Sequence, residues 1–433
     1  MGRKSSYRSS LDFLLNLQRS GIKLGLDRTV NLLDAIGNPQ EHFRSVHIAG
    51  TNGKGSVAAY MNSILYHAGL TSGLFTSPHL VEYTERVRVN GEAISRSDLR
   101  SIVSDIAGAV ASTEASFFEA TTAVAFEQFR RRRVDMAAVE VGMGGRLDST
   151  NVLTPELTAI TSIDFDHMRY LGKTLGLIAG EKAGILKPGV TVATAALKKG
   201  AREAVMKIAR SRRSRVYEIG RHARFEMLGM DIGGCYFEYR GLRGRRLLRT
   251  GMPGWHQAEN ASLAVLCAEL LMERGVALSD RAIERGVEAA LWPGRLQVLS
   301  EDPLIIVDGA HNVAGARMLA RSLEDMGVFP AITVFAVLRD KRYKDMLKHI
   351  ASVTRSFIFT RAENPRALPV ARLRQAAGEL GLKSSGVGRV DRAVDRALGR
   401  LGEGDALLIS GSLFAIGEAM QHMGFEPQRV RLC

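Results

Sequence analysis

The chain has 433 residues, which at about 150 residues per domain predicts two or three domains, each long enough to bury its own core. Hydrophobic residues make up 45% and charged residues 24% of the sequence, with 44 Gly and 11 Pro, a composition that excludes disordered and fibrous proteins. The formal net charge of +14 favours an acidic partner, but 15 Lys and Arg against 5 Asp and Glu fall between Lys198 and Arg249, away from the strongest motifs, which weakens a nucleic-acid-binding interpretation.

Apolar runs of strand length alternate with longer stretches of helical period, which predicts an α/β fold with a mostly parallel sheet. The first unit is a helix over 27–36, a strand over 45–49, a Gly-rich turn and a helix from about 54 to 68. The same pattern continues with strands expected at 73–76, 134–141, 157–163 and 190–195, and helices at 118–131 and 174–186.

The pattern changes over 216–250, where short alternating segments with glycines predict antiparallel hairpins on the edge of the first domain. A helix follows over 258–273. The segment 291–296 then breaks the periodicity, and new strands are expected at 304–308, 332–337, 357–360 and 406–410. We therefore expect two domains, a P-loop domain at 1–296 and a smaller Rossmann-like α/β domain at 297–433.

We expect neither a membrane span nor a signal peptide. No stretch approaches 18 consecutive apolar residues, and the basic N-terminal residues are followed by no apolar segment, so the default location is the cytoplasm. The three cysteines, Cys235, Cys267 and Cys433, are widely spaced and form no CxxC, which argues against a disulfide framework and a zinc site.

A glycine-rich segment lies between a predicted strand and a predicted helix and comprises Gly50, Thr51, Asn52, Gly53, Lys54, Gly55 and Ser56. Backbone N–H groups and the helix N-terminus bind phosphate in such a turn, and Lys54 would reach the β and γ phosphates. The motif departs from GxxxxGK[ST] because Gly55 separates the lysine from Ser56. A plain Gly-rich turn would explain the glycines but not the Lys and Ser, so ATP or another nucleoside triphosphate is the predicted ligand.

A triphosphate site needs Mg²⁺, which binds few protein oxygens and keeps several waters. Glu140 ends a predicted strand, and ligands of open parallel sheets bind beyond the carboxyl ends of strands, so we predict Glu140 as a metal ligand over a structural ion-pair partner. His167 and Lys182 carry less signal alone, because a single His is usually structural and a helical lysine is usually exposed.

The second domain carries two polar clusters at predicted strand ends. Asp308 begins the segment Asp-Gly-Ala-His-Asn, with His311 within it, and Asp340 and Lys341 follow the strand at 332–337. Either cluster alone would be consistent with an ordinary polar loop. Together they predict that the cleft between the domains is the active site.

The order and wording of these motifs resemble the folylpolyglutamate synthase and dihydrofolate synthase family, within the Mur ligase superfamily. The resemblance covers nearly the whole chain: the Gly50 to Ser56 loop, Thr76-Ser-Pro-His-Leu80 with Glu85-Arg86, Phe118-Glu-Ala-Thr121, the segment from Glu140 to Asn151, Asp166-His167, Gly180 to Gly184, His256-Gln257 with Asn260, Pro293-Gly-Arg295, Asp308 to Asn312 and Gly411-Ser-Leu-Phe414.

The resemblance implies an ATP-dependent ligase. The carboxylate of a pterin substrate attacks the γ-phosphate of ATP, an acyl phosphate forms, and the amino group of L-glutamate displaces phosphate. The implied cofactors are ATP and one or two Mg²⁺ ions, with a monovalent cation as a further candidate and no organic prosthetic group. The implied partners are dihydropteroate or reduced folates and L-glutamate, with no nucleic acid and no membrane, and the chain is expected to be a monomer with a glutamate-ligase domain at 297–433 that closes on the ATP-binding domain.

The resemblance also assigns expected roles to single residues. Ser56, Glu140 and His167 match Mg²⁺ ligands, Lys54 the phosphate-binding lysine, and Lys182 a carbamylated lysine that could join a second Mg²⁺. The remaining matches are contacts to ATP (Asn260, Arg295 and Asp308), to phosphate or glutamate (His311), and to substrate (Thr76, Ser77, Pro78, His79, Asp340, Lys341 and Ser412).

Two motifs depart from the family pattern. Val313 stands where many members have the proline of a His-Asn-Pro sequence, which could alter how the following helix begins, and Arg342 stands where a second Asp often follows Asp340-Lys341. Neither change removes a charged group on which the expected site depends.

Three interpretations remain. The first is a dihydrofolate synthase, with or without the further activity of extending glutamate chains. The sequence Phe-Phe-Glu-Ala-Thr-Thr at 117–122 favours similarity to family members that accept dihydropteroate. The second is a Mur-type peptide ligase of cell-wall synthesis, against which stand the 49 residues before Gly50, fewer than a separate nucleotide-sugar-binding domain needs. The third is a non-catalytic, nucleotide-dependent nucleic-acid-binding protein, against which stands the complete set of expected catalytic residues.

Overall fold

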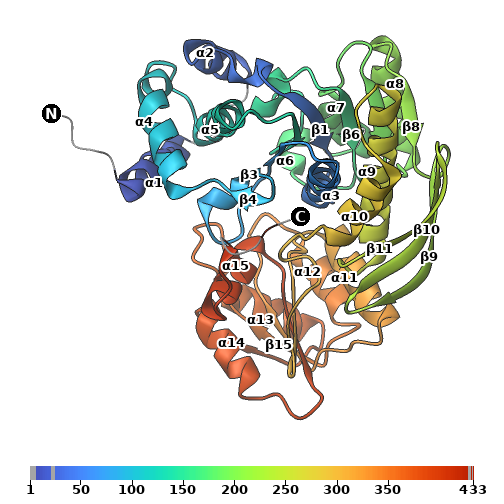
Figure 1. The fold of residues 1–433 in the computed structure, drawn as a ribbon. Helices are drawn as coiled ribbons and strands as arrows, with labels where there is room; N and C mark the ends of the chain where they lie inside the picture. The colour runs from blue at the N-terminus through green and yellow to red at the C-terminus, as the bar shows by residue number, and fades with distance from the viewer. Residues whose placement is uncertain (1–5, 21–24, 428–430, 432) are drawn as a thin grey trace.

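The computed structural model describes residues 6–20, 25–427, 431 and 433. It confirms the α/β fold: an eight-stranded sheet, a three-stranded antiparallel sheet and a six-stranded sheet follow one another along the chain. Figure 1 shows the N-terminal part above and the C-terminal part below, with β9–β11 at the side. In the part of the chain that is described, no helix combines the length and apolar character needed to cross a membrane.

The eight-stranded sheet has the order β4-β3-β2-β5-β1-β6-β7-β8, parallel from β2 to β8. Its strands are β1 (Arg44–Ala49), β2 (Ser72–Phe75), β3 (Val87–Val89), β4 (Glu92–Ala93), β5 (Met136–Glu140), β6 (Leu157–Ile160), β7 (Thr191–Thr194) and β8 (Val216–Glu218). The five strands expected before residue 200 are present, with somewhat different ends. For example, β6 ends at Ile160 because the Thr161 hydroxyl turns to the loop after β1 and donates to the Asn52 carbonyl at 2.7 Å.

Helices cover both faces of this sheet, which explains why β1 is buried throughout Ser45–Ala49. They are α1 (Tyr7–Asn16), α2 (Asp27–Ala35), α3 (Lys54–His67), α4 (Arg96–Ser112), α5 (Phe117–Arg131), α6 (Met168–Leu171), α7 (Leu175–Ala183), α8 (Lys199–Ser211), α9 (Trp255–Glu273) and α10 (Asp280–Ala289). Short 3₁₀ helices lie at Leu17–Ser20, Pro39–Glu41, Tyr83–Arg86 and Ser149–Val152.

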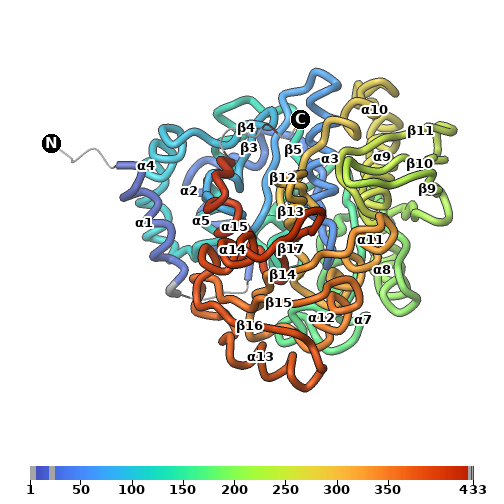
Figure 2. The backbone as a smooth tube through the Cα atoms, turned by 90° about the horizontal axis from the view of Figure 1, so that it is seen from below, coloured from blue at the N-terminus to red at the C-terminus, as the bar shows by residue number. Residues whose placement is uncertain are grey.

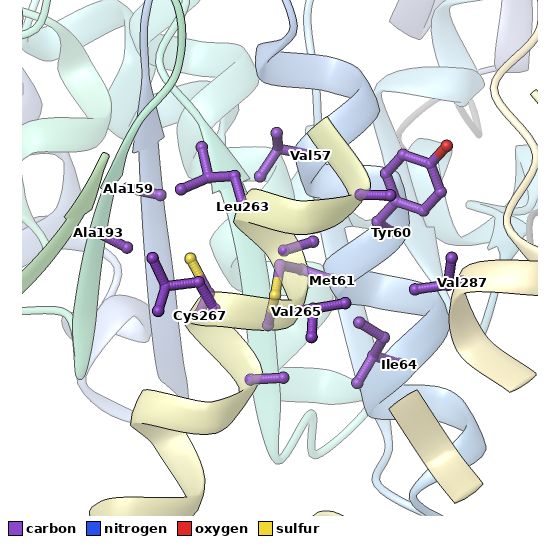
Figure 3. Close-up of a cluster of buried hydrophobic side chains, with 14 of the residues drawn as sticks. Val57, Tyr60, Met61, Ile64, Ala159, Ala193, Leu263, Val265, Cys267 and Val287 are labelled. Carbon is purple, nitrogen blue, oxygen red and sulfur yellow. The ribbon is translucent and has the colours of Figure 1, made fainter. Parts of the chain in front are cut away.

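The helices α3 and α9 share one core with the sheet. Figure 3 shows side chains of both helices, among them Met61 and Leu263, packed beside Ala159 of β6 and Ala193 of β7. Small residues on the strands let the helices approach closely, and each fully buried aliphatic side chain contributes about 1.5–3 kcal/mol. This packing holds the N-terminus of α3 at the end of β1.

The expectation for 216–250 needs correction. Residues Val216–Glu218 form β8, a parallel strand of the large sheet, and not part of a hairpin. The predicted hairpins are confirmed: β9 (Arg224–Asp231), β10 (Gly234–Gly241) and β11 (Gly244–Thr250) form an antiparallel sheet of their own, separate from the eight-stranded sheet. The alternation of apolar and polar residues does not tell which layer a hairpin covers, and here Phe237 and Tyr239 pack on the core of α3 and α9.

The six-stranded sheet has the order β12-β13-β17-β14-β15-β16, with only β12 antiparallel to its neighbour. Its strands are β12 (Gln297–Glu301), β13 (Leu304–Asp308), β14 (Ile332–Phe335), β15 (Ser356–Phe359), β16 (Ser384–Gly386) and β17 (Ala406–Ser410). The helices α11 (Val313–Asp325), α12 (Tyr343–Ile350), α13 (Val370–Glu379), α14 (Val390–Leu398) and α15 (Leu413–His422) alternate with them. In Figure 2, viewed from below, this sheet and its helices lie in front of the N-terminal part.

Candidate active site

The phosphate-binding loop connects the carboxyl end of β1 to the first turn of α3, as the sequence predicts. Gly53, with φ +86°, precedes the helix, and a Cβ atom there would overlap the side-chain amide of Asn260 on α9. The loop is therefore held against α9 through a contact that only glycine allows. The first N–H groups of α3 have no partner within the helix and can bind an anion.

Lys54 and Glu140 face each other beside this loop. The Lys54 ammonium lies 3.9 Å from a Glu140 carboxylate oxygen, and the other carboxylate oxygen accepts a hydrogen bond from the Ser77 backbone N–H at 2.9 Å. Burial raises the pKa of the Glu140 carboxyl, and the charge of Lys54 opposes this rise. The carboxyl ends of β1, β2 and β5 thus bring Lys54, Ser77 and Glu140 together.

Lys182 is buried, although a lysine near the end of a short helix is ordinarily exposed. Its ammonium donates to the Gly50 carbonyl at 2.6 Å, which places it at the start of the phosphate-binding loop. Burial, followed by the nearby charge of Lys54, lowers the pKa of the Lys182 amine to about 7. A large fraction of this amine is therefore uncharged near neutral pH.

The loop after β6 closes over the phosphate-binding loop. The Thr51 hydroxyl donates to the Asp164 carbonyl at 3.0 Å and accepts from the Asp164 N–H at 3.0 Å. His167 follows in a left-handed conformation, φ 49°, at the start of α6. These contacts place Asp166 and His167 next to the cleft.

Asp166 joins the two parts of the molecule. One carboxylate oxygen accepts from Lys341 at 2.6 Å, and the other accepts from the Asn312 amide at 3.2 Å and lies 3.7 Å from His311 Nε2. Burial alone would raise the pKa of the Asp166 carboxyl, but the charges of Lys341 and His167 outweigh it and hold the pKa below its usual value. Asn312 also exchanges two hydrogen bonds with Asn52 of the phosphate-binding loop, at 2.8 and 3.3 Å.

The end of β13 supplies the facing wall. Asp308 accepts hydrogen bonds from the backbone N–H groups of Leu296 and Ala310, at 2.9 and 2.8 Å, and burial raises the pKa of its carboxyl. His311 Nδ1 donates to the Gly309 carbonyl at 2.8 Å, which leaves Nε2 toward the cleft. Burial, followed by the Lys341 charge, lowers the pKa of His311 to about 4, so the ring is neutral near pH 7.

The departure at Val313 leaves the helix intact. Val313 is the first residue of α11, and the Asn312 side chain caps the helix by accepting from the Gly315 N–H at 2.9 Å. The asparagine therefore fixes the start of the helix without the proline.

The segment after β2 borders a pocket beside the phosphate-binding loop. Among the residues that line it are Ser77, His79, Arg88, Glu140, Trp292 and Arg295. His79 Nδ1 accepts from Arg86 at 2.8 Å, and burial, followed by the Arg86 charge, lowers the pKa of His79 to about 3. Thr76 and Pro78 line the same pocket, so the structure keeps the expected 76–79 segment together with Glu140 and Arg295.

Three further expected residues, Asp340, Ser412 and Ser56, differ in how exposed they are. Asp340 is exposed, 3.8 Å from its neighbour Lys341, while Ser412 is buried at the start of α15 with no hydrogen-bond partner for its hydroxyl among the described residues. Ser56 is buried in the first turn of α3.

The sequence motif around Asn260 includes His256 and Gln257, to which the sequence analysis assigns no role. Gln257 Nε2 and His256 Nδ1 are buried at the start of α9 and have no partner among the described residues, while Gln257 Oε1 accepts from Asn260 at 3.2 Å. Unsatisfied buried donors and acceptors are costly, so these atoms favour a polar ligand at this place. Their place beside Asn260 in the His-Gln-x-x-Asn sequence is the feature from which a role could have been predicted.

The donor set suits Mg²⁺. Within the described residues, no three His, Cys, Asp or Glu side chains converge into a ready metal cage. A magnesium ion at a triphosphate needs only one or two protein oxygens, and the Glu140 carboxylate and the Ser56 hydroxyl are the oxygen donors at this loop.

A phosphate-binding loop that faces a second α/β domain across a cleft of Lys, His and carboxylate groups defines an ATP-dependent ligase of the Mur type. The family models agree: residues 48–268 match the Mur ligase middle domain and residues 294–413 match the Mur ligase, glutamate ligase domain.

The chain belongs to the dihydrofolate synthase/folylpolyglutamate synthase family. It is 34% identical to the dihydrofolate synthase/folylpolyglutamate synthase of Bacillus subtilis, over 97% of this chain and 99% of that protein. The folylpolyglutamate synthase of Mycobacterium tuberculosis, solved with ADP and AMPPCP, superposes with a TM-score of 0.89 at 32% identity, covering 96% of this chain and 100% of that one. The E. coli FolC structure with DHPP and ADP has a TM-score of 0.85 at 28% identity, over 98% of this chain and 99% of that one.

Proposed function

We propose that this ligase adds L-glutamate to the carboxylate of dihydropteroate, of a reduced folate, or of both. The observation that carries the proposal is the cleft itself, in which the Lys54–Glu140 pair at the phosphate-binding loop faces His311 and Lys341 of the second domain, with Asp166 joining them. We divide the chain accordingly into an ATP-binding domain, 1–296, and a glutamate-ligase domain, 297–433.

The reaction has two steps. A carboxylate oxygen of the acceptor attacks the γ-phosphorus of ATP, the bond from that phosphorus to the bridging oxygen breaks, and ADP leaves. The glutamate amine then attacks the acyl carbon, loses a proton, and phosphate departs with the former carboxylate oxygen. Lys54 offsets the charge on the transferred phosphoryl group, a task of positioning and electrostatics that requires no protein nucleophile.

The metal ligands we propose are Ser56, Glu140 and His167, for one or two Mg²⁺ ions. The ion supplies charge neutralisation for the phosphates when it is bound. Glu140 is held in place for this role by the Ser77 N–H, and its burial keeps water from competing for the carboxylate.

Lys182 is the proposed carbamate-forming residue. Its burial, its contact with the Gly50 carbonyl and its lowered pKa favour a neutral amine that can add to carbon dioxide. The adduct would turn a cation next to Lys54 into an anion, which plain lysine cannot supply.

The nucleotide and the acceptor occupy neighbouring parts of the cleft in this proposal. Asn260, Arg295 and Asp308 contact ATP, and the Gln257 Nε2 group, which has no partner among the described residues, supplies a donor beside Asn260. The 76–79 segment contacts the acceptor. On the glutamate side we place His311, Lys341, Asp340 and Ser412.

The test is ADP release by the purified protein with ATP, Mg²⁺ and L-glutamate, comparing dihydropteroate with tetrahydrofolate. Turnover with dihydropteroate alone identifies a dihydrofolate synthase, with tetrahydrofolate alone a chain extender, and with both a bifunctional enzyme. The mass of the product must increase by one glutamyl residue per ADP. Absence of acceptor-dependent ADP release with either acceptor would refute the proposal.

A further inference from the structure

Trp292 lies in the segment between α10 and β12, which connects the two halves of the molecule. Its indole rests directly on Gly55 in the first turn of α3: a Cβ atom on Gly55 would lie 2.8 Å from the indole Nε1 and Cζ2 atoms. The indole therefore occupies the space that any other residue at position 55 would need. It also lines the pocket that contains Glu140 and Arg295.

The helix α10 and the connecting segment that follows it contact α3 at two places. The helix α10 packs so closely on α3 that a Cβ atom on Gly286 would lie 2.5 Å from the Ile64 Cα atom. Trp292 makes the second contact, on Gly55. Two contacts on one helix fix both the position and the direction of the segment relative to the phosphate-binding loop.

Beyond Trp292 the segment joins the second domain. The Gly294 carbonyl accepts from the Gly309 N–H at 2.8 Å, and the Leu296 N–H donates to Asp308 at 2.9 Å. Arg295 lies between these two bonds, and a Cβ atom on Gly309 would overlap its guanidinium. The contacts thus run without interruption from Gly55 through Trp292 and Arg295 to Gly309.

We propose that Trp292 is a positioning residue. Its indole fixes the position of residues 292–296 relative to the phosphate-binding loop, so that Arg295 faces the phosphates bound at that loop. The proposal rests on the proposed function, because it assumes that ATP binds there. A positioning error of about 1 Å at a reacting group can reduce a rate by about 100-fold. Loss of the contact between the indole and Gly55 is therefore expected to lower the reaction rate.

The kinetic test compares Trp292→Ala with Trp292→Phe and with the neighbouring control Leu291→Ala, whose side chain is 45% exposed. We expect Trp292→Ala to lower kcat/KM for ATP by about 10- to 100-fold, while Trp292→Phe, which keeps a ring on Gly55, stays within about threefold of the parent protein. Leu291→Ala should match the parent. If folded Trp292→Ala retains the parent kcat/KM, or if Trp292→Phe is as impaired as Trp292→Ala, the proposal is wrong.

A spectroscopic test leaves Trp292 in place. The chain has 2 Trp, so Trp255→Phe leaves Trp292 as the sole indole. We expect its emission to change when a non-hydrolysable ATP analogue saturates the protein, as followed in parallel by calorimetry. Calorimetric binding with unchanged emission would overturn the role of Trp292 alone, whereas absence of any nucleotide binding would overturn the proposed function and this inference with it.

Discussion

The glycines before and after α3 are constrained differently, and substitutions can separate the constraints. Gly53 and Gly69 both have positive φ, +86° and +82°, but a Cβ atom at position 53 overlaps Asn260 whereas position 69 has open space. An L-residue in this conformation costs about 1–2 kcal/mol. The backbone strain is therefore common to both sites, and the collision with α9 is specific to one.

We predict that Gly69→Ala lowers the free energy of unfolding by about 1–2 kcal/mol and that Gly53→Ala lowers it further, because its Cβ overlaps Asn260. Only Gly53→Ala is expected to weaken binding of a non-hydrolysable ATP analogue. Chemical denaturation and titration calorimetry measure the two effects. Equal nucleotide affinity in the two variants would show that the loop does not depend on its contact with Asn260.

Lys54 is the residue that we propose to offset the charge on the transferred phosphoryl group. Removing one preorganised charge from a transition state commonly costs about 100- to 1000-fold in rate. We predict a loss of kcat of at least about 100-fold for Lys54→Met in the ADP-release assay. Lys207→Met, an exposed lysine of α8, serves as the control and should keep the parent rate.

At the scale of elements, the three-stranded sheet is tied to α9 by one buried carboxylate. Glu269 is fully buried and accepts hydrogen bonds from the Tyr239 hydroxyl and the Leu242 N–H, both at 2.9 Å, and pairs with Arg246, whose side chain is 5% exposed. Removing Glu269 leaves Arg246 with Asp280 of α10, at 2.6 Å, as an ion-pair partner, but leaves the Tyr239 hydroxyl and the Leu242 N–H without their acceptor in a buried place.

We predict that Glu269→Ala lowers the free energy of unfolding by about 3–5 kcal/mol, whereas Glu226→Ala, an exposed carboxylate on β9, changes it by less than about 0.5 kcal/mol. Urea denaturation of both variants tests this. Similar midpoints for the two would mean that Glu269 does not anchor the sheet.

Individual strands are predicted well from the sequence, whereas contacts between distant segments are not. Strands at 304–308 and 406–410 are predicted to the residue, because apolar runs bounded by Gly and Asp have no alternative boundary. The motifs also predict Glu140 and Asp308 at strand ends and Lys54 at the start of a helix, as the structure has them. The contacts of Trp292 with Gly55 and of Asn52 with Asn312 could not be predicted, because they join segments hundreds of residues apart and depend on how the two sheets meet. For the same reason, the sequence predicts the hairpins of 224–250 but not the helices on which they pack.

At the scale of the whole molecule, Asp166 holds the two domains together through Lys341 and Asn312. We predict that Asp166→Asn, which loses the charge opposite Lys341, increases the radius of gyration in small-angle scattering and lowers kcat. Asp391→Asn, whose carboxylate pairs with Arg389 at the start of α14, is the matched control. If Asp166→Asn scatters identically to the parent, the cleft is held closed by other contacts.

In the proposed reaction, the γ-phosphoryl group of ATP is transferred to the acceptor carboxylate before glutamate is added. The most direct measurement uses an acceptor whose carboxylate carries oxygen-18, followed by mass spectrometry of the released phosphate. We expect one labelled oxygen in each phosphate, released in step with ADP and the glutamyl product. Unlabelled phosphate at the same yield of product would contradict it, because the carboxylate oxygen would then never have bonded to phosphorus.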